Sequence, residues 1–274
     1  MKLSAANSFF VLFFASALFL SPVLSAQTMR PVSGTLRTKD GISISYDHYR
    51  QGFKSVIVVC PGFFNSKENR WMRKTAEVFL PAYDVIMFDF RGHGSSSGKY
   101  TWSAKENLDL DAVLDYAKTQ GYARIGIVAY SLGAAAAIND AAARDDIDSM
   151  VLVSCPYRFD RINYYFWEPG MFYDLKENMA CKWEGKGART AGIFTKKEAP
   201  IDSIKNIKRT ALFLIQGDSD WVIKDIHAKK LYEAARTKKK MEIIKGGFHA
   251  ERLLQFNYEK IKGLMLGWFS DTLK

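Results

Sequence analysis

The sequence predicts an α/β fold: a doubly wound, mostly parallel sheet that begins with an antiparallel hairpin and carries a cap insertion. Three observations predict it. Short, nearly continuous apolar runs alternate with helical patterns from residue 56 onward, which is typical of parallel strands covered on both faces. Two segments of alternating polarity precede these runs. One interval between predicted strands is too long for a simple connection.

The first two predicted strands are residues 32–38 and 42–49, whose polarity alternates with a period of two. Lys39, Asp40 and Gly41 join them, and an Asp-Gly pair between two alternating segments is a common hairpin signal. An antiparallel pair therefore leads into the rest of the sheet.

The remaining predicted strands are apolar runs without alternation, as expected for strands buried on both faces. They span residues 56–60, 85–89, 125–129, 150–155, 211–215 and 241–244. Helical patterns lie between or after most of them, at residues 71–80, 104–119, 132–143, 225–235 and 251–269. In such sheets ligands bind beyond the carboxyl ends of the strands, so we look for functional residues there.

A cap insertion is predicted at residues 156–210, which leaves residues 27–155 and 211–274 as the core. The insertion is rich in aromatic side chains, most of which we expect to form a small core within the cap. The others would line an apolar cleft beneath it. The aromatic residues are Tyr157, Phe159, Tyr164, Tyr165, Phe166, Trp167, Phe172, Tyr173 and Trp183.

Residues 1–26 read as a secretory signal peptide, which predicts export to a periplasm or out of the cell. Lys2 precedes an apolar run at residues 9–20, Pro22 breaks the run, and small residues suited to cleavage end at Ala26. The run is short for a membrane span, which needs about 20 apolar residues, although an uncleaved anchor is the alternative. Gln27 stands where a bacterial lipoprotein would carry its lipidated cysteine, so we expect no lipid anchor.

The net charge of +10 indicates solubility and weak attraction to anionic surfaces. The sequence contains neither a stripe of basic residues nor a known nucleic-acid-binding motif, so nucleic acid is not an expected partner. The run from Lys238 to Lys240 fits a solvated turn. The expected partner is a small-molecule ester or acyl substrate, and the sequence leaves the oligomeric state open.

The three cysteines, Cys60, Cys155 and Cys181, are an odd number and leave at least one thiol outside any intramolecular bridge. Cys60 and Cys155 end apolar runs and are expected to be buried, inert thiols, while a bridge between Cys155 and Cys181 stays open. No metal site is predicted, because four histidines and three cysteines are scattered without ligand spacing. No cofactor is predicted either.

Ser131 is the first candidate for chemistry. It lies in Ala129-Tyr130-Ser131-Leu132-Gly133, between an apolar strand and an alanine-rich helix. A sharp turn from strand to helix holds the serine hydroxyl out of the sheet in front of the helix N-terminus, and it needs small residues on either side. This arrangement suits a nucleophile.

A serine nucleophile needs a positioned base, and a third group must orient that base. Two of the four histidines are not expected to act as the base. His48 lies in the first hairpin, and His227 is expected on a helix surface. His93 and His249 both lie at the carboxyl edge of the predicted sheet. His249, on the glycine-rich loop after the last strand, is the better candidate. Asp218 and Asp220, after the strand at 211–215, compete for the third role.

Five motifs at strand ends, taken together, resemble the α/β-hydrolase superfamily, specifically its capped esterase, lipase and serine-aminopeptidase-like branch. The resemblance covers residues 32–270. The motifs are Pro61-Gly62-Phe63, the run from Asp89 to Ser96, Ala129-Tyr130-Ser131-Leu132-Gly133, Gly217-Asp218-Ser219-Asp220 and Phe248-His249.

The resemblance implies a role for each candidate. Ser131 would be the nucleophile and His249 the base, and the family's Gly-x-x-Asp pattern favours Asp220 over Asp218 as the acid. The backbone N–H groups of Phe63 and Leu132 would bind the oxyanion. His93 would support a loop and take no part in catalysis.

Three positions depart from the family pattern. Ala129 replaces a more common glycine, which a tight turn accepts because alanine is small. Pro61 and Gln216 stand where histidine is frequent, and we expect both to reshape the rim of the pocket. Ser131 argues against a haloalkane dehalogenase, which needs a carboxylate at that position.

The sequence therefore predicts a serine hydrolase that cleaves a carboxylic ester through an acyl-enzyme. A thioesterase would use the same three residues. An aminopeptidase would need cap carboxylates to hold an ammonium group, for which Glu168, Asp174 and Glu177 are available. A non-catalytic secreted binding protein is the alternative from another class. The acyl chain length and the biological substrate stay open.

Overall fold

The computed structural model describes residues 30–162, 167–192 and 196–274. The predicted signal peptide at residues 1–26 and the cap aromatics Tyr164, Tyr165 and Phe166 lie outside the described residues. Within the described residues, no helix combines the length and the apolar character needed to cross a bilayer.

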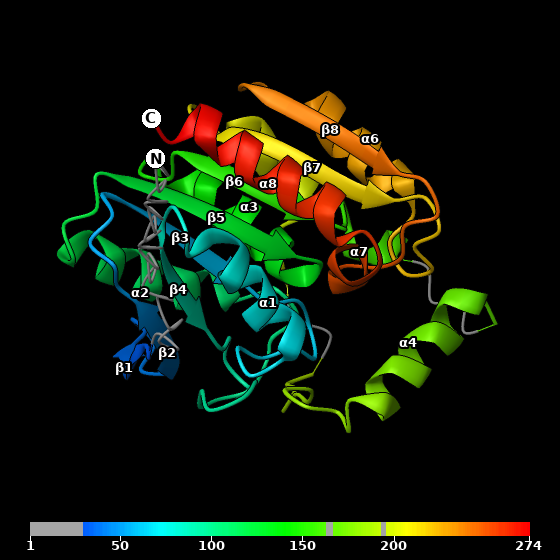
Figure 1. The fold of residues 1–274 in the computed structure, drawn as a ribbon, viewed down its shortest axis with the longest axis horizontal. Helices are drawn as coiled ribbons and strands as arrows, with labels where there is room; N and C mark the ends of the chain where they lie inside the picture. The colour runs from blue at the N-terminus through cyan, green and yellow to red at the C-terminus, as the bar shows by residue number, and fades with distance from the viewer. Residues whose placement is uncertain (1–29, 163–166, 193–195) are drawn as a thin grey trace, which may run out of the picture.

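The centre of the fold is one eight-stranded sheet with the order β1-β2-β4-β3-β5-β6-β7-β8 (Figure 1). β1 and β2 form the antiparallel hairpin, β2 also pairs antiparallel with β4, and all other neighbours are parallel. The strands are β1 (Val32–Arg37), β2 (Ser43–Tyr49), β3 (Ser55–Cys60), β4 (Asp84–Phe88), β5 (Arg124–Tyr130), β6 (Ser149–Val153), β7 (Ala211–Gly217) and β8 (Lys239–Ile244). The predicted doubly wound, mostly parallel sheet is confirmed.

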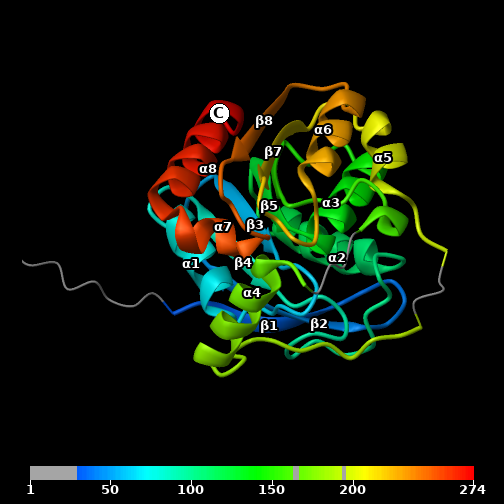
Figure 2. The same cartoon turned by 90° about the vertical axis from the view of Figure 1, so that its right-hand side faces the viewer.

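Helices cover both faces of the sheet, with α1 and α8 on one side and α2, α3 and α6 on the other (Figure 2). The helices of the core are α1 (Arg70–Phe79), α2 (Glu106–Thr119), α3 (Leu132–Ala143), α6 (Asp225–Ala234), α7 (Glu251–Phe256) and α8 (Tyr258–Thr272). The interval predicted to be a cap, residues 156–210, is called the cap below. It contains α4 (Pro169–Ala180), α5 (Pro200–Ser203) and the short 3₁₀ turns η1 (Phe159–Arg161) and η2 (Ile204–Asn206).

The apolar strands divide their side chains between two cores. In β3, Val56 and Val58 belong to the core under α2 and α3, whereas Ile57 and Val59 belong to the core under α1 and α8. Side chains alternate between the faces of a strand, so a strand that is buried on both faces must be apolar at every position. This is why runs without polar alternation mark the central strands.

The predicted single helix at residues 251–269 is wrong. The structure has two helices, α7 and α8, separated at Asn257, whose backbone angles are φ −132° and ψ 39°. These angles lie outside the helical region, so the hydrogen-bond ladder of α7 stops there. The break lets α7 lie at the site while α8 runs along the sheet (Figure 1).

The prediction that most cap aromatics form a small core is also wrong for the described residues. Trp167 is 72% exposed and Phe172 59%, and Gly170 is the only buried residue of α4. The reason is the polarity of α4, which turns its polar side chains toward the body of the protein. Asp174 bonds to Arg252 there, and Glu177 bonds to Gln255.

The cysteines are free thiols in the structure, and no bridge joins Cys155 to Cys181. Cys60 and Cys155 are buried, as predicted. Burial raises the pKa of the Cys60 thiol well above its ordinary value, and it raises the pKa of Cys155 as well. Both thiols are therefore protonated and inert at neutral pH.

A buried cation ties the loop after β4 to its surroundings. The Arg91 guanidinium donates to Asp109 of α2 at 2.7 Å and to Asp40 of the hairpin turn at 2.8 Å. Arg91 and Asp109 are both almost completely buried. The loop that follows Arg91 carries His93, so this ion pair helps to position a segment at the carboxyl edge.

We predict that Arg91→Leu lowers the free energy of unfolding by about 3–5 kcal/mol, because it leaves the Asp109 carboxylate buried without its cation. Urea unfolding followed by circular dichroism measures the loss. The matched control is Lys74→Leu, which breaks the exposed Lys74–Glu77 pair and should change the free energy by less than about 0.5 kcal/mol. Similar losses in both variants would contradict the prediction.

Candidate active site

Ser131 lies at the turn between β5 and α3, with backbone angles of φ 49° and ψ −120°. A non-glycine residue with positive φ is strained and has to be held by its surroundings. The Ser131 N–H donates to the Val153 carbonyl at 2.8 Å. Gly133 is required beside it, because a Cβ there would lie 2.2 Å from the Pro61 carbonyl oxygen. The sharp turn predicted from the sequence is present.

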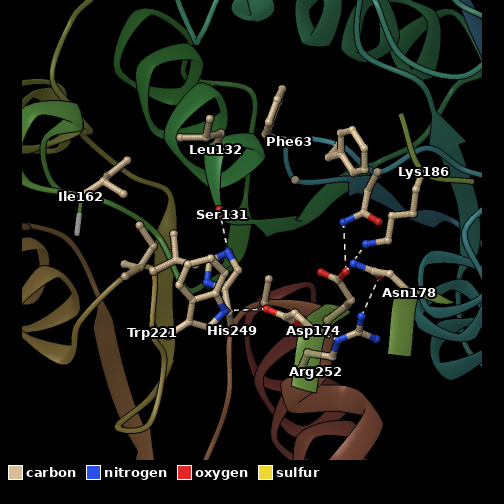
Figure 3. A pocket seen from close by; sticks show the side chains of 17 residues that line it. Phe63, Ser131, Leu132, Ile162, Asp174, Asn178, Lys186, Trp221, His249 and Arg252 are labelled. Carbon is tan, nitrogen blue, oxygen red and sulfur yellow. Dashed lines mark hydrogen bonds and ion pairs between the residues drawn. The ribbon is translucent and has the colours of Figure 1, made fainter. Parts of the chain in front are cut away.

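His249 connects Ser131 to Asp220 in one chain of hydrogen bonds. His249 Nε2 lies 3.1 Å from Ser131 Oγ (Figure 3), and His249 Nδ1 lies 2.7 Å from Asp220 Oδ2. The next residue, Ala250, has a φ of 50°, and its N–H donates to the buried Ser154 hydroxyl at 3.0 Å. The loop after β8 is therefore fixed immediately beside the imidazole.

The structure separates the two candidate aspartates. Asp220 is fully buried, and its Oδ1 accepts from the backbone N–H groups of Val222 at 2.9 Å and Ile223 at 2.8 Å. Asp218 is exposed, and its carboxylate accepts from the Gly246 N–H at 2.7 Å. Asp220 therefore contacts the imidazole, while Asp218 braces the loop that carries it.

Burial and charge act in opposite directions on the His249–Asp220 pair. Burial of the imidazole lowers the pKa of His249, but the charge and hydrogen bond of Asp220 outweigh burial and hold that pKa above its ordinary value. Burial raises the pKa of Asp220, yet His249 and the two backbone N–H donors bring the net pKa below its ordinary value. Asp220 is thus ionised at neutral pH and orients the Nδ1–H of His249.

The two residues predicted to bind an oxyanion through their backbone N–H groups are Phe63 and Leu132. Phe63, after β3, and Leu132, the first residue of α3, both line the cavity that contains Ser131. Among the hydrogen bonds of the described residues, neither of these two N–H groups donates to a protein acceptor. The first N–H groups of a helix have no partner within the helix, so Leu132 can donate to a ligand.

His93 holds the loop that carries Phe63. Its Nε2 accepts from the Phe64 N–H at 3.0 Å, and its Nδ1 lies 3.2 Å from the Arg91 carbonyl oxygen. This pattern needs the neutral ring with its proton on Nδ1. Burial lowers the pKa of His93 to about 4, so the ring is neutral at pH 7. The supporting role implied by the resemblance agrees with these contacts.

The other two histidines lie outside the cavity. His48 is buried between the hydroxyl groups of Tyr116 and Tyr122. The expectation that His227 lies on the surface is wrong, because this residue is 1% exposed. His227 Nδ1 accepts from the Tyr157 N–H at 3.0 Å, which ties the start of the cap to α6.

Pro61 and Gln216 do not line the cavity, so the expected reshaping of the rim is wrong. Gln216 is completely buried at the end of β7 and donates from Nε2 to Asp220 Oδ2 at 3.1 Å. The same amide nitrogen donates to the Ile223 carbonyl at 2.7 Å. Sequence reasoning missed this support for Asp220, although a polar residue ending an otherwise apolar strand was a usable signal.

The hydrogen-bonded chain opens on a cavity of about 320 Å³. Ile162, Trp221 and Leu132 lie to one side of Ser131 or above it, whereas Lys186, Asn178 and Arg252 gather on the other side (Figure 3). The lining residues are Gly62, Phe63, Phe64, Asn65, Ser131, Leu132, Ile162, Asp174, Asn178, Lys186, Trp221, Val222, Ile223, His249, Ala250, Glu251 and Arg252. The cavity thus has an apolar part and a polar part.

Across the described ranges, no grouping of histidine, cysteine and acidic side chains could hold a metal ion.

The three cap carboxylates considered for an ammonium site, Glu168, Asp174 and Glu177, all bond to residues of the core. Glu168 accepts from Lys224 at 2.7 Å, and Glu177 accepts from Gln255 at 2.6 Å. Asp174 accepts from Arg252 at 2.8 Å and from the Trp221 indole at 2.6 Å. These contacts hold the cap on the core.

Comparison with solved structures shows the same fold in other proteins. An esterase of Pyrococcus furiosus, Pf2001, superimposes with a TM-score of 0.73 at 24% identity, over 90% of this chain and 94% of the other. An esterase from Exiguobacterium antarcticum gives a TM-score of 0.70 at 15% identity, over 87% of this chain and 100% of the other. A bromoperoxidase from Bacillus anthracis gives a TM-score of 0.68 at 18% identity, over 87% of this chain and 100% of the other.

Sequence comparison finds the protein YqkD of Bacillus subtilis (strain 168), which is 28% identical over 207 residues. The match covers 72% of this chain and 65% of the length of YqkD. The family model described as alpha/beta hydrolase fold matches residues 55–196, which is more than half of the chain. With its parallel sheet and its strand-to-helix turn at Ser131, this chain belongs to the alpha/beta hydrolase fold family.

Proposed function

We propose that the protein is a serine hydrolase that cleaves a carboxylic ester through an acyl-enzyme. The observation that carries the proposal is the chain of hydrogen bonds from Ser131 through His249 to Asp220, which opens on the cavity. The common fold with two esterases supports it. The sequence of residues 1–26 supports the further proposal that the enzyme acts after export.

Acylation begins when His249 Nε2 removes the proton of Ser131 Oγ as this oxygen attacks the ester carbonyl. The carbonyl π electrons move to its oxygen, which accepts hydrogen bonds from the N–H groups of Phe63 and Leu132. When the intermediate collapses, the bond to the alkoxy oxygen breaks and the His249 proton passes to that oxygen. The alcohol leaves and an acyl-serine ester remains.

Deacylation repeats these steps with water. His249 Nε2 removes a proton from water as the water oxygen attacks the acyl carbon, and the oxyanion again forms at the same two donors. Collapse breaks the bond to Ser131 Oγ, which regains a proton from His249. The carboxylic acid is released and the serine is restored.

The cap contacts favour an ester over a peptide with a free amino terminus. Glu168 pairs with Lys224, and Asp174 pairs with Arg252. A substrate ammonium group would have to displace one of these cations. Two of the three carboxylates that an aminopeptidase could use are therefore already paired with a cation, and the third, Glu177, accepts a hydrogen bond from Gln255.

We predict that Ser131→Ala reduces hydrolysis of p-nitrophenyl butyrate by on the order of 10,000-fold or more, because it removes the nucleophile. A fluorophosphonate probe should label the wild-type protein at Ser131 and leave the variant unlabelled. The control is Ser219→Ala, an exposed serine on the loop of Asp220, which should keep its activity. Equal turnover by Ser131→Ala would reject the proposal, and failure to label the wild type would favour a binding protein.

The two aspartates provide a matched pair. Asp220→Asn should lower kcat by on the order of 10,000-fold, because the amide cannot stabilise the imidazolium or hold the same tautomer. Asp218→Asn should cost less than about 10-fold, because Asp218 touches only the loop. Steady-state kinetics of both variants make the comparison, and a larger loss at Asp218 would overturn the assignment.

The raised pKa of His249 predicts the acidic limb of the pH–rate profile. The base must be neutral, so kcat/KM should fall as the pH drops, with a midpoint above 6.5, the ordinary value of histidine. In Asp220→Asn the opposing carboxylate charge is lost and burial dominates, so the midpoint of the residual activity should move to lower pH. Profiles between about pH 5 and 9 test both statements. A wild-type midpoint below 6.5 would contradict the first.

A further inference from the structure

Buried charge forms one wall of the cavity, opposite its apolar part. Lys186 Nζ lies 2.6 Å from Glu251 Oε1, and the two side chains are only 6% and 8% exposed. Asn65 Nδ2 donates to the same carboxylate oxygen at 3.1 Å. These three residues, here called the polar wall, come from the loop after β3, the cap and the start of α7.

The charges around the polar wall cancel. Arg252 lies next to Glu251 and pairs with the cap residue Asp174 at 2.8 Å, and it also donates to Asn178 Oδ1 at 2.8 Å. Two cations and two carboxylates therefore face this end of the cavity and neutralise one another. A charged group on a substrate would leave one buried charge uncompensated, which costs several kcal/mol. The wall therefore suits a neutral group.

One atom of the polar wall lacks a partner. Asn65 is 4% exposed and lines the cavity, and its Oδ1 has no hydrogen-bond partner within the described structure. The other buried polar atoms in this condition belong to residues that do not line the cavity, namely Asn139, Asp140, Gln216 and Trp268. An unsatisfied acceptor in a native structure calls for an explanation, and a ligand donor provides one.

Attachment of the cap does not by itself explain the polar wall. The pair between Lys224 and Glu168 also joins the cap to the core, and both of its side chains are 28% exposed and outside the cavity. A contact between cap and core therefore does not require a fully buried ion pair. Burying the Lys186–Glu251 pair costs desolvation energy that well-packed apolar residues would avoid.

We propose that Asn65, Lys186 and Glu251 form a subsite for a neutral hydroxyl group of the ester substrate, an inference that rests on the proposed function. A hydroxyl both donates and accepts hydrogen bonds. The Lys186 ammonium has three donor hydrogens, one of which the contact with Glu251 uses, and Asn65 Oδ1 is an acceptor. Glu251 follows His249 by two residues, so the hydroxyl is held a short distance from the reacting carbonyl.

The preferred substrate then has an apolar portion beside Ile162 and Trp221 and a hydroxyl-bearing portion at the polar wall. Two pairs of esters test this by differing only in hydroxyl groups. Glycerol monobutyrate and propyl butyrate vary the alcohol portion, and methyl 6-hydroxyhexanoate and methyl hexanoate vary the acyl portion. In at least one pair, kcat/KM measured by pH-stat should be about 10-fold or more higher for the hydroxylated ester.

The double variant Lys186→Met, Glu251→Gln should bring that ratio close to 1, because it removes the pair without leaving one charge alone. Asn65→Leu is a second variant that leaves the ion pair in place, and it should also lower the selectivity ratio. It tests the subsite even when the double variant does not fold. Lys224→Met is the matched control, since it breaks a cap–core pair outside the cavity. Its selectivity ratio should equal that of the wild type.

Binding to Ser131→Ala separates this subsite from the hydrolase proposal. In a ligand-observed NMR titration, the hydroxylated member of the selected pair should bind about 10-fold more tightly than its partner. Turnover with a kcat/KM ratio near 1 in both ester pairs would overturn the subsite, while the hydrolase proposal would stand. Selective binding without turnover would support the subsite and reject the hydrolase. A ratio that falls equally in Lys224→Met would assign the effect to cap attachment and overturn the subsite.

Discussion

The close approach of β3, β5 and α3 at Ser131 is the constraint on which the site depends. Ser131 adopts a positive φ because the chain reverses from a central strand into a helix within one residue. Gly133 has no room for a side chain against the Pro61 carbonyl. The same packing places Phe63 and Leu132 with Ser131 in the lining of one cavity. The surrounding structure can hold this strained backbone because β3 and β5 are buried in a continuous sheet.

The residues around this turn are held by polar groups that take no part in the proposed chemistry. His93 fixes the loop of Phe63, Gln216 donates to Asp220, and Ser154 accepts from Ala250 beside His249. Each is buried, and each adds a hydrogen bond to a backbone N–H or a carboxylate beside the reacting groups. The geometry of the site thus rests on a layer of neutral hydrogen bonds around it.

The cap is attached in a different way. α4 turns its carboxylates and Asn178 toward Arg252 and Gln255, and it leaves Phe172 and Met179 exposed. Contacts of this kind are directional, so they hold the polar side of α4 over the cavity although Gly170 is the only residue that α4 buries. This arrangement also lets Lys186 reach Glu251 and places charge in the cavity wall.

The sequence by itself determined the sheet, because a strand buried on both faces must be apolar throughout, and β3 to β7 could be read directly from that property. It also placed Ser131, His249 and the two aspartates at the carboxyl edge, since strand ends are local features. The residues themselves left Asp218 and Asp220 in competition, and only the resemblance favoured Asp220. Tertiary structure decided which of them reaches the imidazole, because it buries Asp220 against His249 and leaves Asp218 exposed. It also decided that His227 is buried, that Gln216 supports Asp220 and that Trp167, Phe172, Tyr173 and Trp183 of the cap are exposed. These properties depend on contacts between segments far apart in the chain, which the pattern of any one segment does not contain.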